Sequence, residues 1–546
     1  MAPADDSEDR LELGELVPAL LAAVLAALLL WLLPVGAAIV HSRQAPRLGA
    51  AEAMIGSVRL AADGRWSDPR LAYPPRARRA MPAGRSWWLA AAVPLLGFAA
   101  AAGLAWRRAD RLRARARLGR RPYDPRGARP RAWGRPRDLG ELTVRRRSSE
   151  RFGFGRLDGR LLASDREAQV CLVAPPRAGK STRFVVPWTL EHGGPALVTS
   201  TKLDLFEATS RARQKKGAVS VWDPFAGTGA CWTPIEGCED WGAALRQGHW
   251  LADAVGEAEH PAARFWNSEA AKLLAPLLHA AALAGHGMDT VLRWIDRQDE
   301  AEPATVLAGS GDAAAADQLQ AVLGLDPRNR STTFMSAGHL VAAYRYPEVL
   351  RTARPGFSAE RFLNGEGNTL YLCASARHQR LLAALIVAIV SAVLEQAKGL
   401  ARAGRPCSPC LRVLLDETAN IAPLADLPQQ LSEAGSQSIR FATVWQSLAQ
   451  MRDRYGDAAD AILASSTAKL FMGPVTDDTT RRYISGALGD ELQEHNDHLS
   501  WRSKASPSEL QQLERDRALL VNGSLPPAVI RVAPYWELRD LKRLAR

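Results

Sequence analysis

The sequence predicts an α/β domain with a mainly parallel sheet, an all-α insert within that domain, and a two-helix transmembrane anchor before it. Three observations support this fold class. Short, continuously apolar runs alternate with helical segments from about residue 150 onward, as expected for parallel strands covered on both faces. The alternation stops between residues 241 and 345, where the chain is rich in Ala. Two long uncharged stretches lie before residue 110.

The uncharged stretches cover residues 16–40 and 86–106. Each reaches the roughly 20 residues that span the hydrocarbon core of a bilayer. A cleaved signal peptide has a shorter apolar region and a basic leading segment, whereas the segment before residue 16 is acidic. We therefore assign residues 1–110 to a membrane anchor with two transmembrane helices.

Residues 111–150 are predicted to form a juxtamembrane linker that is rich in Arg and Pro. Sixteen Arg lie between Arg107 and Arg147, and the whole chain has a formal net charge of +12. Such a segment favours contact with anionic lipid headgroups, and contact with DNA phosphates is the second interpretation.

The apolar run 169–173 is followed by Ala-Pro-Pro-Arg-Ala-Gly-Lys-Ser-Thr, a phosphate-binding P-loop between a strand and a helix. This motif predicts ATP and Mg²⁺ as ligands. We expect Lys180 to contact the β- and γ-phosphates and the Ser181 hydroxyl to ligate Mg²⁺, while backbone N–H groups surround the phosphates. The predicted nucleotide-binding residues are Ala174, Arg177, Ala178, Gly179, Lys180, Ser181 and Thr182.

A second motif is the apolar run 413–415, which ends in Asp416 and Glu417. This pattern is typical of a Walker B strand, in which Asp416 holds Mg²⁺ and Glu417 activates the attacking water. An ordinary strand ending at a charged turn is the alternative. A third apolar run ends at Gln446, whose amide we expect to sense the γ-phosphate or hold the attacking water. A polar residue where a strand meets a loop is the alternative. The predicted catalytic residues are thus Lys180, Asp416, Glu417 and Gln446.

The nucleotide-binding domain is assigned to residues 151–240 and 346–546, and the all-α insert to residues 241–345. The expected strands are 169–173, 196–200, 218–222, 369–373, 412–415, 440–445, 468–472 and 529–532. Cys407 and Cys410 form a lone C-x-x-C pair without a second ligand pair, so we interpret the six cysteines as ordinary thiols rather than a zinc site.

The order of these motifs resembles the TraG/TraD-like coupling proteins of type IV secretion systems. The more specific phrases are Asp-Glu-Thr-Ala-Asn-Ile at 416–421, Gln-Ser-Leu-Ala-Gln at 446–450 and Phe-Trp-Asn at 265–267. The resemblance implies a RecA-like P-loop ATPase that assembles as a homo-hexamer on the cell membrane. It would bring DNA bound to a relaxase, or protein cargo, to the secretion channel and drive conjugative transfer by ATP hydrolysis.

The resemblance also implies a multi-pass protein whose ATPase domain lies in the cytoplasm, where ATP is found. Arginines occur in both the loop 41–86 and the following linker, so the positive-inside rule alone does not orient the anchor. One departure concerns residues 433–438, where many relatives carry an arginine that can reach a neighbouring subunit. Here the first arginine is Arg440, so either Arg440 or another arginine takes that role, or activation by a neighbouring subunit is weak in this protein.

Two other functions remain open from the sequence. The first is a membrane-bound DNA translocase of the FtsK type, although residues 485–546 do not read as its DNA-orienting module. The second is an adaptor that binds nucleotide and recruits partners without pumping. Lys180, Asp416 and Glu417 argue against the adaptor, because it has no need of all three.

Overall fold

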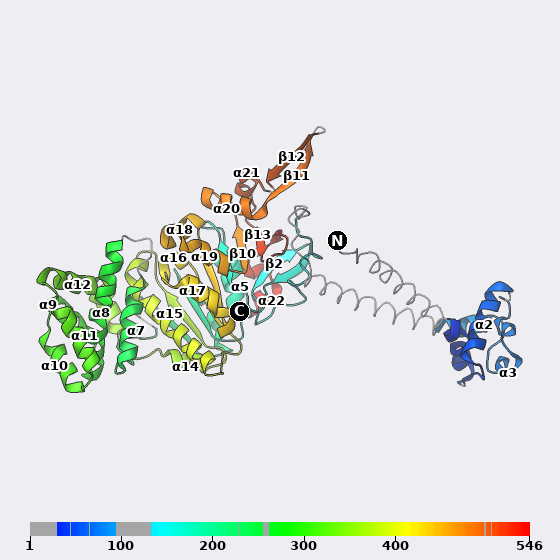
Figure 1. Cartoon of the computed structure of the whole chain (residues 1–546), viewed down its shortest axis with the longest axis horizontal. Coiled ribbons are helices and arrows are strands. Elements are labelled where there is room, and N and C mark those ends of the chain that lie inside the picture. The colour runs from blue at the N-terminus through cyan, green and yellow to red at the C-terminus, as the bar shows by residue number, and fades with distance from the viewer. Residues whose placement is uncertain are drawn as a thin grey trace, which may run out of the picture. The chain divides into compact units, whose positions relative to one another are not determined.

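The computed structural model describes residues 30–43, 45–64, 66–93, 133–227, 229–254, 261–495, 498–503 and 505–545 (Figure 1). The chain divides into two compact units, residues 1–128 and 129–546. Most of the two predicted membrane segments, 16–40 and 86–106, lies outside the described residues. The described ends of both are helical, at Leu30–Ser42 and at residues 85–93.

Among the described residues, only α15 (Gln379–Arg402) is long and apolar enough to cross a bilayer. Two thirds of its apolar window is buried inside the second unit, which is typical of a core helix. The two-helix anchor is therefore not confirmed by the described residues and stays a prediction.

The first unit has a small core of its own, formed by α2 (Ala50–Ala62), η1 (Pro69–Ala72) and α3 (Pro75–Arg78) together with the two helical ends. Tyr73 and Trp87 are fully buried in it and stack with ring centroids 6.4 Å apart. The predicted loop between the two membrane segments is thus a folded element.

The second unit is built on a twelve-stranded sheet. Seven strands on one side of it are parallel, and five on the other side are antiparallel. From edge to edge the strands are β1 (Thr143–Val144), β3 (Arg160–Ala163), β2 (Gly153–Leu157), β14 (Ala528–Arg531), β13 (Arg517–Asn522), β10 (Ala468–Met472), β4 (Val170–Val173), β9 (Ile439–Trp445), β8 (Leu411–Leu415), β5 (Ala196–Ser200), β7 (Thr369–Cys373) and β6 (Val219–Trp222).

The parallel strands are apolar throughout because both faces of the sheet are covered. On β8, Val413 and Leu415 face the core that contains α15, whereas Leu414 faces the core that contains Trp188. This double burial confirms the predicted α/β fold class. It also explains why these strands read as continuous apolar runs.

The helices that cover the sheet follow its strands in sequence (Figure 1). They are α5 (Val186–Glu191), α6 (Asp204–Gln214), α15, α16 (Thr418–Ile421), α17 (Leu427–Glu433), α18 (Leu448–Tyr455), α19 (Ala458–Ser465), α20 (Asp478–Leu488), α21 (Pro507–Gln511) and α22 (Arg539–Leu544). The hairpin of β11 (Asp490–His495) and β12 (His498–Ser503) forms a separate sheet that projects from this body.

Between β6 and β7 the chain is helical, as the sequence predicts for residues 241–345. The helices of residues 261–340 lie together at one end of the unit in Figure 1, whereas the last helix before β7 lies beside α15. The buried side chains of this segment are continuous with the core around α15. The helices between β6 and β7 are α7 (Trp241–Ala252), α8 (Pro261–Leu283), α9 (Met288–Arg297), α10 (Ala301–Ser310), α11 (Ala313–Leu323), α12 (Pro327–Leu340), α13 (Pro347–Thr352) and α14 (Ala359–Leu363), with the 3₁₀ turn η3 (Ala342–Arg345) after α12.

The antiparallel side of the sheet includes residues that the sequence assigns to the linker. Leu139 and Leu142 are buried, and Gly134 N donates a 2.8 Å hydrogen bond to Pro527 O. The described segment that begins at Trp133 is therefore packed against the domain, so the linker boundary at residue 150 moves toward the N-terminus. Residues 111–132 of the predicted linker lie outside the described residues.

A buried arginine lies near the start of β8, at the opposite end of that strand from Asp416. Arg412 is fully buried, and its guanidinium donates to Trp188 O at 2.9 Å and lies 4.4 Å from the ring centroid of Phe152. It thus links β8 to α5 and to the residue before β2.

Candidate nucleotide-binding site

The P-loop connects the end of β4 to a helix that begins at Ser181. The first turn of that helix is π-helical, η2 (Ser181–Val185), and it continues into α5. Arg177 and Gly179 have positive φ angles of 62° and 86°. A Cβ at Gly179 would lie 3.2 Å from Arg183 Nε, so the loop has little space for a side chain there.

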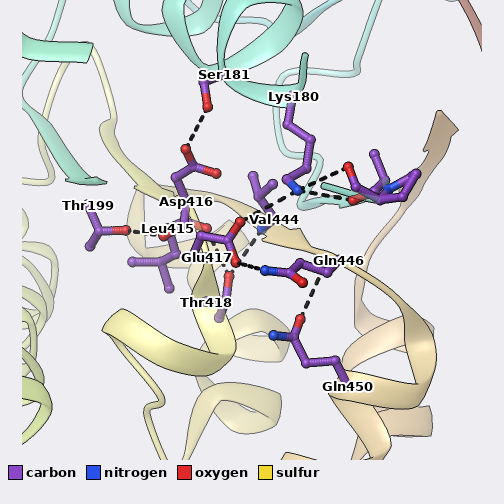
Figure 2. A network of polar contacts seen from close by, with 12 residues as sticks. Lys180, Ser181, Thr199, Leu415, Asp416, Glu417, Thr418, Val444, Gln446 and Gln450 are labelled. Carbon is purple, nitrogen blue, oxygen red and sulfur yellow. Dashed lines mark hydrogen bonds and ion pairs between the residues drawn. The ribbon is translucent and has the colours of Figure 1, made fainter. Parts of the chain in front are cut away.

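The Lys180 ammonium is held over the start of the loop (Figure 2). Its Nζ donates to Ala174 O at 3.0 Å and lies 3.5 Å from Glu417 Oε1. The side chain is only 8% exposed. A buried positive charge at this point fits a bound phosphate, and Glu417 serves as its counter-ion in this arrangement.

The Ser181 hydroxyl donates a 2.8 Å hydrogen bond to Asp416 Oδ2. The other carboxylate oxygen, Oδ1, is buried and has no hydrogen-bond partner among the described residues. Burial, reinforced by the negative charge of Glu417, raises the pKa of Asp416 to about 6. A desolvated carboxylate beside a hydroxyl fits Mg²⁺, which prefers oxygen ligands.

The turn after β8 separates the directions of the two acids. Glu417 has a left-handed backbone, with φ at 58°. Two threonines fix the strand end around it: Thr199 donates to Asp416 O at 2.9 Å, and Thr418 donates to Leu415 O at 2.8 Å. Asp416 therefore faces Ser181, whereas Glu417 faces Lys180 (Figure 2).

Gln446 follows β9, which lies between β4 and β8. Its side-chain Nε2 donates to Glu417 Oε2 at 2.7 Å, and its backbone N–H donates to Gln450 Oε1 at 3.1 Å. The amide is thus placed to orient Glu417. The sheet order explains this position, since β9 ends beside both the P-loop strand and the Walker B strand.

The structure brings Lys180, Ser181, Asp416, Glu417 and Gln446 into one site. The other predicted P-loop residues contribute differently. Ala174 and Ala178 are buried, and Thr182 donates to Gly179 O at 3.2 Å. The side chain of Arg177 is exposed and has no hydrogen-bond or ion-pair partner among the residues that the structure describes.

Residue-level reasoning did not single out Thr199, Thr418 or Gln450 as part of the site. Thr199 and Thr418 are buried hydroxyl residues at strand ends, and that position was their only signal. Gln450 lies in the phrase 446–450, and its spacing of four residues from Gln446 is a helical spacing.

Arg440 does not take the role of an arginine that reaches a neighbouring subunit. It lies at the start of β9, the end of that strand away from Gln446. Its guanidinium donates to the backbone carbonyls of Arg166, Gly435 and Ala434, and the residue is buried. Arg440 is therefore a structural residue that holds the ends of neighbouring segments together.

Comparison with known proteins places this site in a family. Residues 139–543 match the family described as type IV secretory system conjugative DNA transfer. The chain belongs to this family. The match covers the P-loop, the Walker B strand, the helical insert and the antiparallel strands, and it confirms the resemblance to TraG/TraD-like coupling proteins.

Individual relatives of the chain share less than a quarter of the aligned residues with it. The chain is 24% identical over 432 residues to protein VirD4 of Rhizobium radiobacter, covering 71% of this chain and 59% of VirD4. It is 22% identical over 399 residues to the conjugal transfer protein TraG of Agrobacterium fabrum, covering 66% and 59%. The matched regions span about three fifths of the length of these relatives.

Solved structures of the coupling protein TrwB share the fold. The unbound monoclinic form has a TM-score of 0.59 at 19% identity, covering 73% of this chain and 92% of TrwB. The complex of TrwB with ADP and Mg²⁺ has a TM-score of 0.58 at 19% identity, covering 75% and 95%. At this identity the likeness supports the mixed α/β fold and nothing finer.

Proposed function

We propose that this protein is a membrane-anchored ATPase that couples DNA with its relaxase, or protein cargo, to a type IV secretion channel. ATP hydrolysis drives the transfer. The observation that carries this proposal is the convergence of Lys180, Ser181, Asp416, Glu417 and Gln446 from three neighbouring strand ends. Membership of the conjugative DNA transfer family supplies the biological setting.

The site fits ATP and Mg²⁺. Lys180 and the helix that begins at Ser181 offer positive charge and N–H groups to phosphate oxygens. Asp416 and Ser181 offer oxygen ligands, one of them the unpartnered Oδ1. When bound, the metal would neutralise phosphate charge and draw Asp416 into its ionised form. TrwB has been solved with ADP and Mg²⁺ and with an ATP analogue.

Each chain residue then has a defined role in hydrolysis. Lys180 leaves Glu417 for the phosphates, since their negative charge competes for the same ammonium. Glu417 then accepts a proton from the attacking water, and Gln446 keeps its carboxylate oriented through the 2.7 Å hydrogen bond. Ser181 and Asp416 would hold the metal, which would neutralise phosphate charge when bound.

The proposal includes a homo-hexamer and two transmembrane helices, with the ATPase domain in the cytoplasm. Ring assembly would let an arginine of one copy complete the nucleotide site of the next copy. That arginine would be one other than Arg440, because the Arg440 guanidinium is bonded to backbone carbonyls of its own chain. Right-side-out cells treated with external protease would test the topology. Cleavage within the P-loop domain, with the segment 41–86 intact, would contradict it.

ATP hydrolysis by the full chain in lipid nanodiscs tests the enzyme assignment. Lys180→Ala should abolish hydrolysis, whereas Lys272→Ala, which removes an exposed lysine of α8, should not. Conjugative transfer by the Lys180→Ala variant at the normal level would favour a recruiting adaptor. Transfer without a secretion channel would favour an FtsK-type translocase.

A further inference from the structure

A second cavity of about 1090 Å³ lies between the helical insert and the motor core. It is separate from the P-loop, since no residue of 174–182 lines it. The residues that matter for its chemistry come from five helices: Trp266 and Asn267 on α8, His339 on α12, Arg380 on α15, Asn420 on α16 and Gln450 on α18.

Two residues that line this cavity lie shortly after the ends of β8 and β9, the strands that lead to Glu417 and Gln446. Asn420 follows Glu417 by three residues, and Gln450 follows Gln446 by four. Gln450 also bonds to the catalytic site, because its Oε1 accepts the 3.1 Å hydrogen bond from Gln446 N. Gln446 in turn donates to Glu417. Two glutamine side chains, those of Gln450 and Gln446, therefore link the cavity wall to the catalytic glutamate.

The Gln450 amide has two ends with different surroundings. Its oxygen is engaged by Gln446, and its nitrogen points away from Gln446 in Figure 2. Within the described ranges, that nitrogen has no hydrogen-bond partner. A ligand with an acceptor group can therefore bind Gln450 without displacing Gln446.

The cavity wall is rich in uncommitted donors. Arg380 has no ion pair, and the side chains of Asn267, His339 and Asn420 have no hydrogen bond within the part of the chain that the structure describes. Among the described residues, Asp453 is the one acid that lines the wall, and Arg380 and Arg454 are the two arginines that line it. Donors in this excess suit a ligand that carries repeated acceptors and negative charge.

Aromatic rings lie at the same place. Trp266 lines the cavity, and the neighbouring Phe265 is 56% exposed, with its ring centroid 5.1 Å from that of Trp266. Aromatic faces beside a guanidinium are what single-stranded nucleic acid uses, since bases stack on the rings while phosphates pair with arginine.

We propose that this cavity binds a short segment of single-stranded DNA, and that Gln450 reports its occupancy to Glu417 through Gln446. The proposal rests on the proposed transfer function, and it names where the cargo meets the motor. A phosphate oxygen held by Arg380 and Gln450 fixes the Gln450 amide. That in turn fixes Gln446 and the catalytic carboxylate, so hydrolysis becomes faster when a strand is present.

The test uses the full chain in nanodiscs and a fluorescein-labelled oligothymidylate. Anisotropy measures binding, and phosphate release measures hydrolysis with and without the strand. Arg380→Ala should weaken binding about tenfold and lower the salt dependence by about one phosphate contact. Arg402→Ala, at the other end of α15 and exposed, is the matched control and should behave as the wild type.

A second pair of variants separates binding from reporting. Gln450→Glu keeps an oxygen for Gln446 N but loses the amide donor, so the ratio of stimulated to basal hydrolysis should fall to about one. Trp266→Ala should weaken binding without changing that ratio at saturation. A purely structural role for Gln450 would lower both rates equally and would leave the ratio at its wild-type value, which would overturn the reporting step.

Other outcomes decide the site and the ligand. Wild-type affinity in both Arg380→Ala and Trp266→Ala would show that the strand binds elsewhere. Stimulation by a relaxase polypeptide but not by the oligonucleotide would replace DNA with protein as the ligand. Failure of the wild type to hydrolyse ATP while binding the strand at Arg380 would instead contradict the proposed ATPase and leave the cavity assignment standing.

Discussion

Gln446 Nε2 lies 2.7 Å from Glu417 Oε2, where β9 and β8 end side by side. The same carboxylate has its other oxygen 3.5 Å from Lys180 Nζ. Glu417 is therefore held between a neutral amide and a positive charge. A phosphate that attracts Lys180 leaves the amide as the remaining constraint on the carboxylate.

Gln446→Ala should lower kcat by about 10- to 100-fold with little change in nucleotide affinity, because it removes a group that orients the base without touching the P-loop. Steady-state hydrolysis and fluorescent-nucleotide binding measure the two quantities. Gln320→Ala, an exposed glutamine on α11, is the control. A loss of affinity at unchanged kcat would place Gln446 in nucleotide binding instead.

Glu417→Gln should bind ATP at least as tightly as the wild type, because Lys180 no longer has a competing carboxylate. Hydrolysis should slow by about 100- to 10,000-fold, since the amide cannot accept a proton. Single-turnover hydrolysis with pre-bound ATP measures this effect. Weak binding in this variant would mean that Glu417 holds the loop structure rather than the chemistry.

The raised pKa of Asp416 predicts a pH effect on the nucleotide-free protein. Its pKa is about 6 in the folded state against a reference value of 3.8, so the folded state binds the proton more tightly. This residue's contribution to the free energy of unfolding is therefore most favourable below pH 4 and is lost as the pH rises through 6.

Asp416→Asn removes that charge and should stabilise the nucleotide-free protein at pH 8 by on the order of 2 kcal/mol. Denaturant unfolding of the variant and the wild type at pH 5 and pH 8 measures the difference, which should shrink at pH 5. Mg²⁺-dependent nucleotide binding should be lost in the same variant. An equal difference in stability between the variant and the wild type at both pH values would show that Asp416 is well solvated.

Arg412→Met should destabilise the second unit by about 2–5 kcal/mol, because the backbone carbonyls of Trp188 and Ser149 lose their buried donor. Chemical denaturation of the full chain measures the change. Arg402→Met replaces an exposed arginine and should leave stability unchanged. An unchanged free energy of unfolding in Arg412→Met would mean that packing of the Met side chain compensates for the loss of those hydrogen bonds.

The sequence indicates the parallel half of the sheet well because those strands are buried on both faces. Leu411–Leu415 and Ile439–Trp445 are apolar along nearly their whole length, and such a run predicts a strand that is buried on both faces. The antiparallel strands are harder to predict. β2 contains two glycines, and its Arg156 is exposed, so neither alternation nor an apolar run is visible in Gly153–Leu157.

The residues of the candidate site could be singled out because their motifs are short and local. The contacts among them could not, since they depend on which strand ends become neighbours. Gln446 meets Glu417 only because β9 lies beside β8. Arg440 is different, because the predicted strand 440–445 already places it at the end away from Gln446. Its hydrogen bonds to the carbonyls of neighbouring segments could not be predicted, since they depend on tertiary contacts.

The place of β14 in the sheet has a consequence for synthesis of the protein. β14 lies between β13 and β2, so a strand made among the last residues separates one made near residue 155 from the rest of the sheet. The early strands β1–β3 are not joined to the rest of the sheet until the ribosome has nearly finished the chain, because β14 is the strand that connects them. A nascent chain that stops before residue 528 exposes unpaired strand edges, which favour aggregation and make it a target for chaperones and proteases.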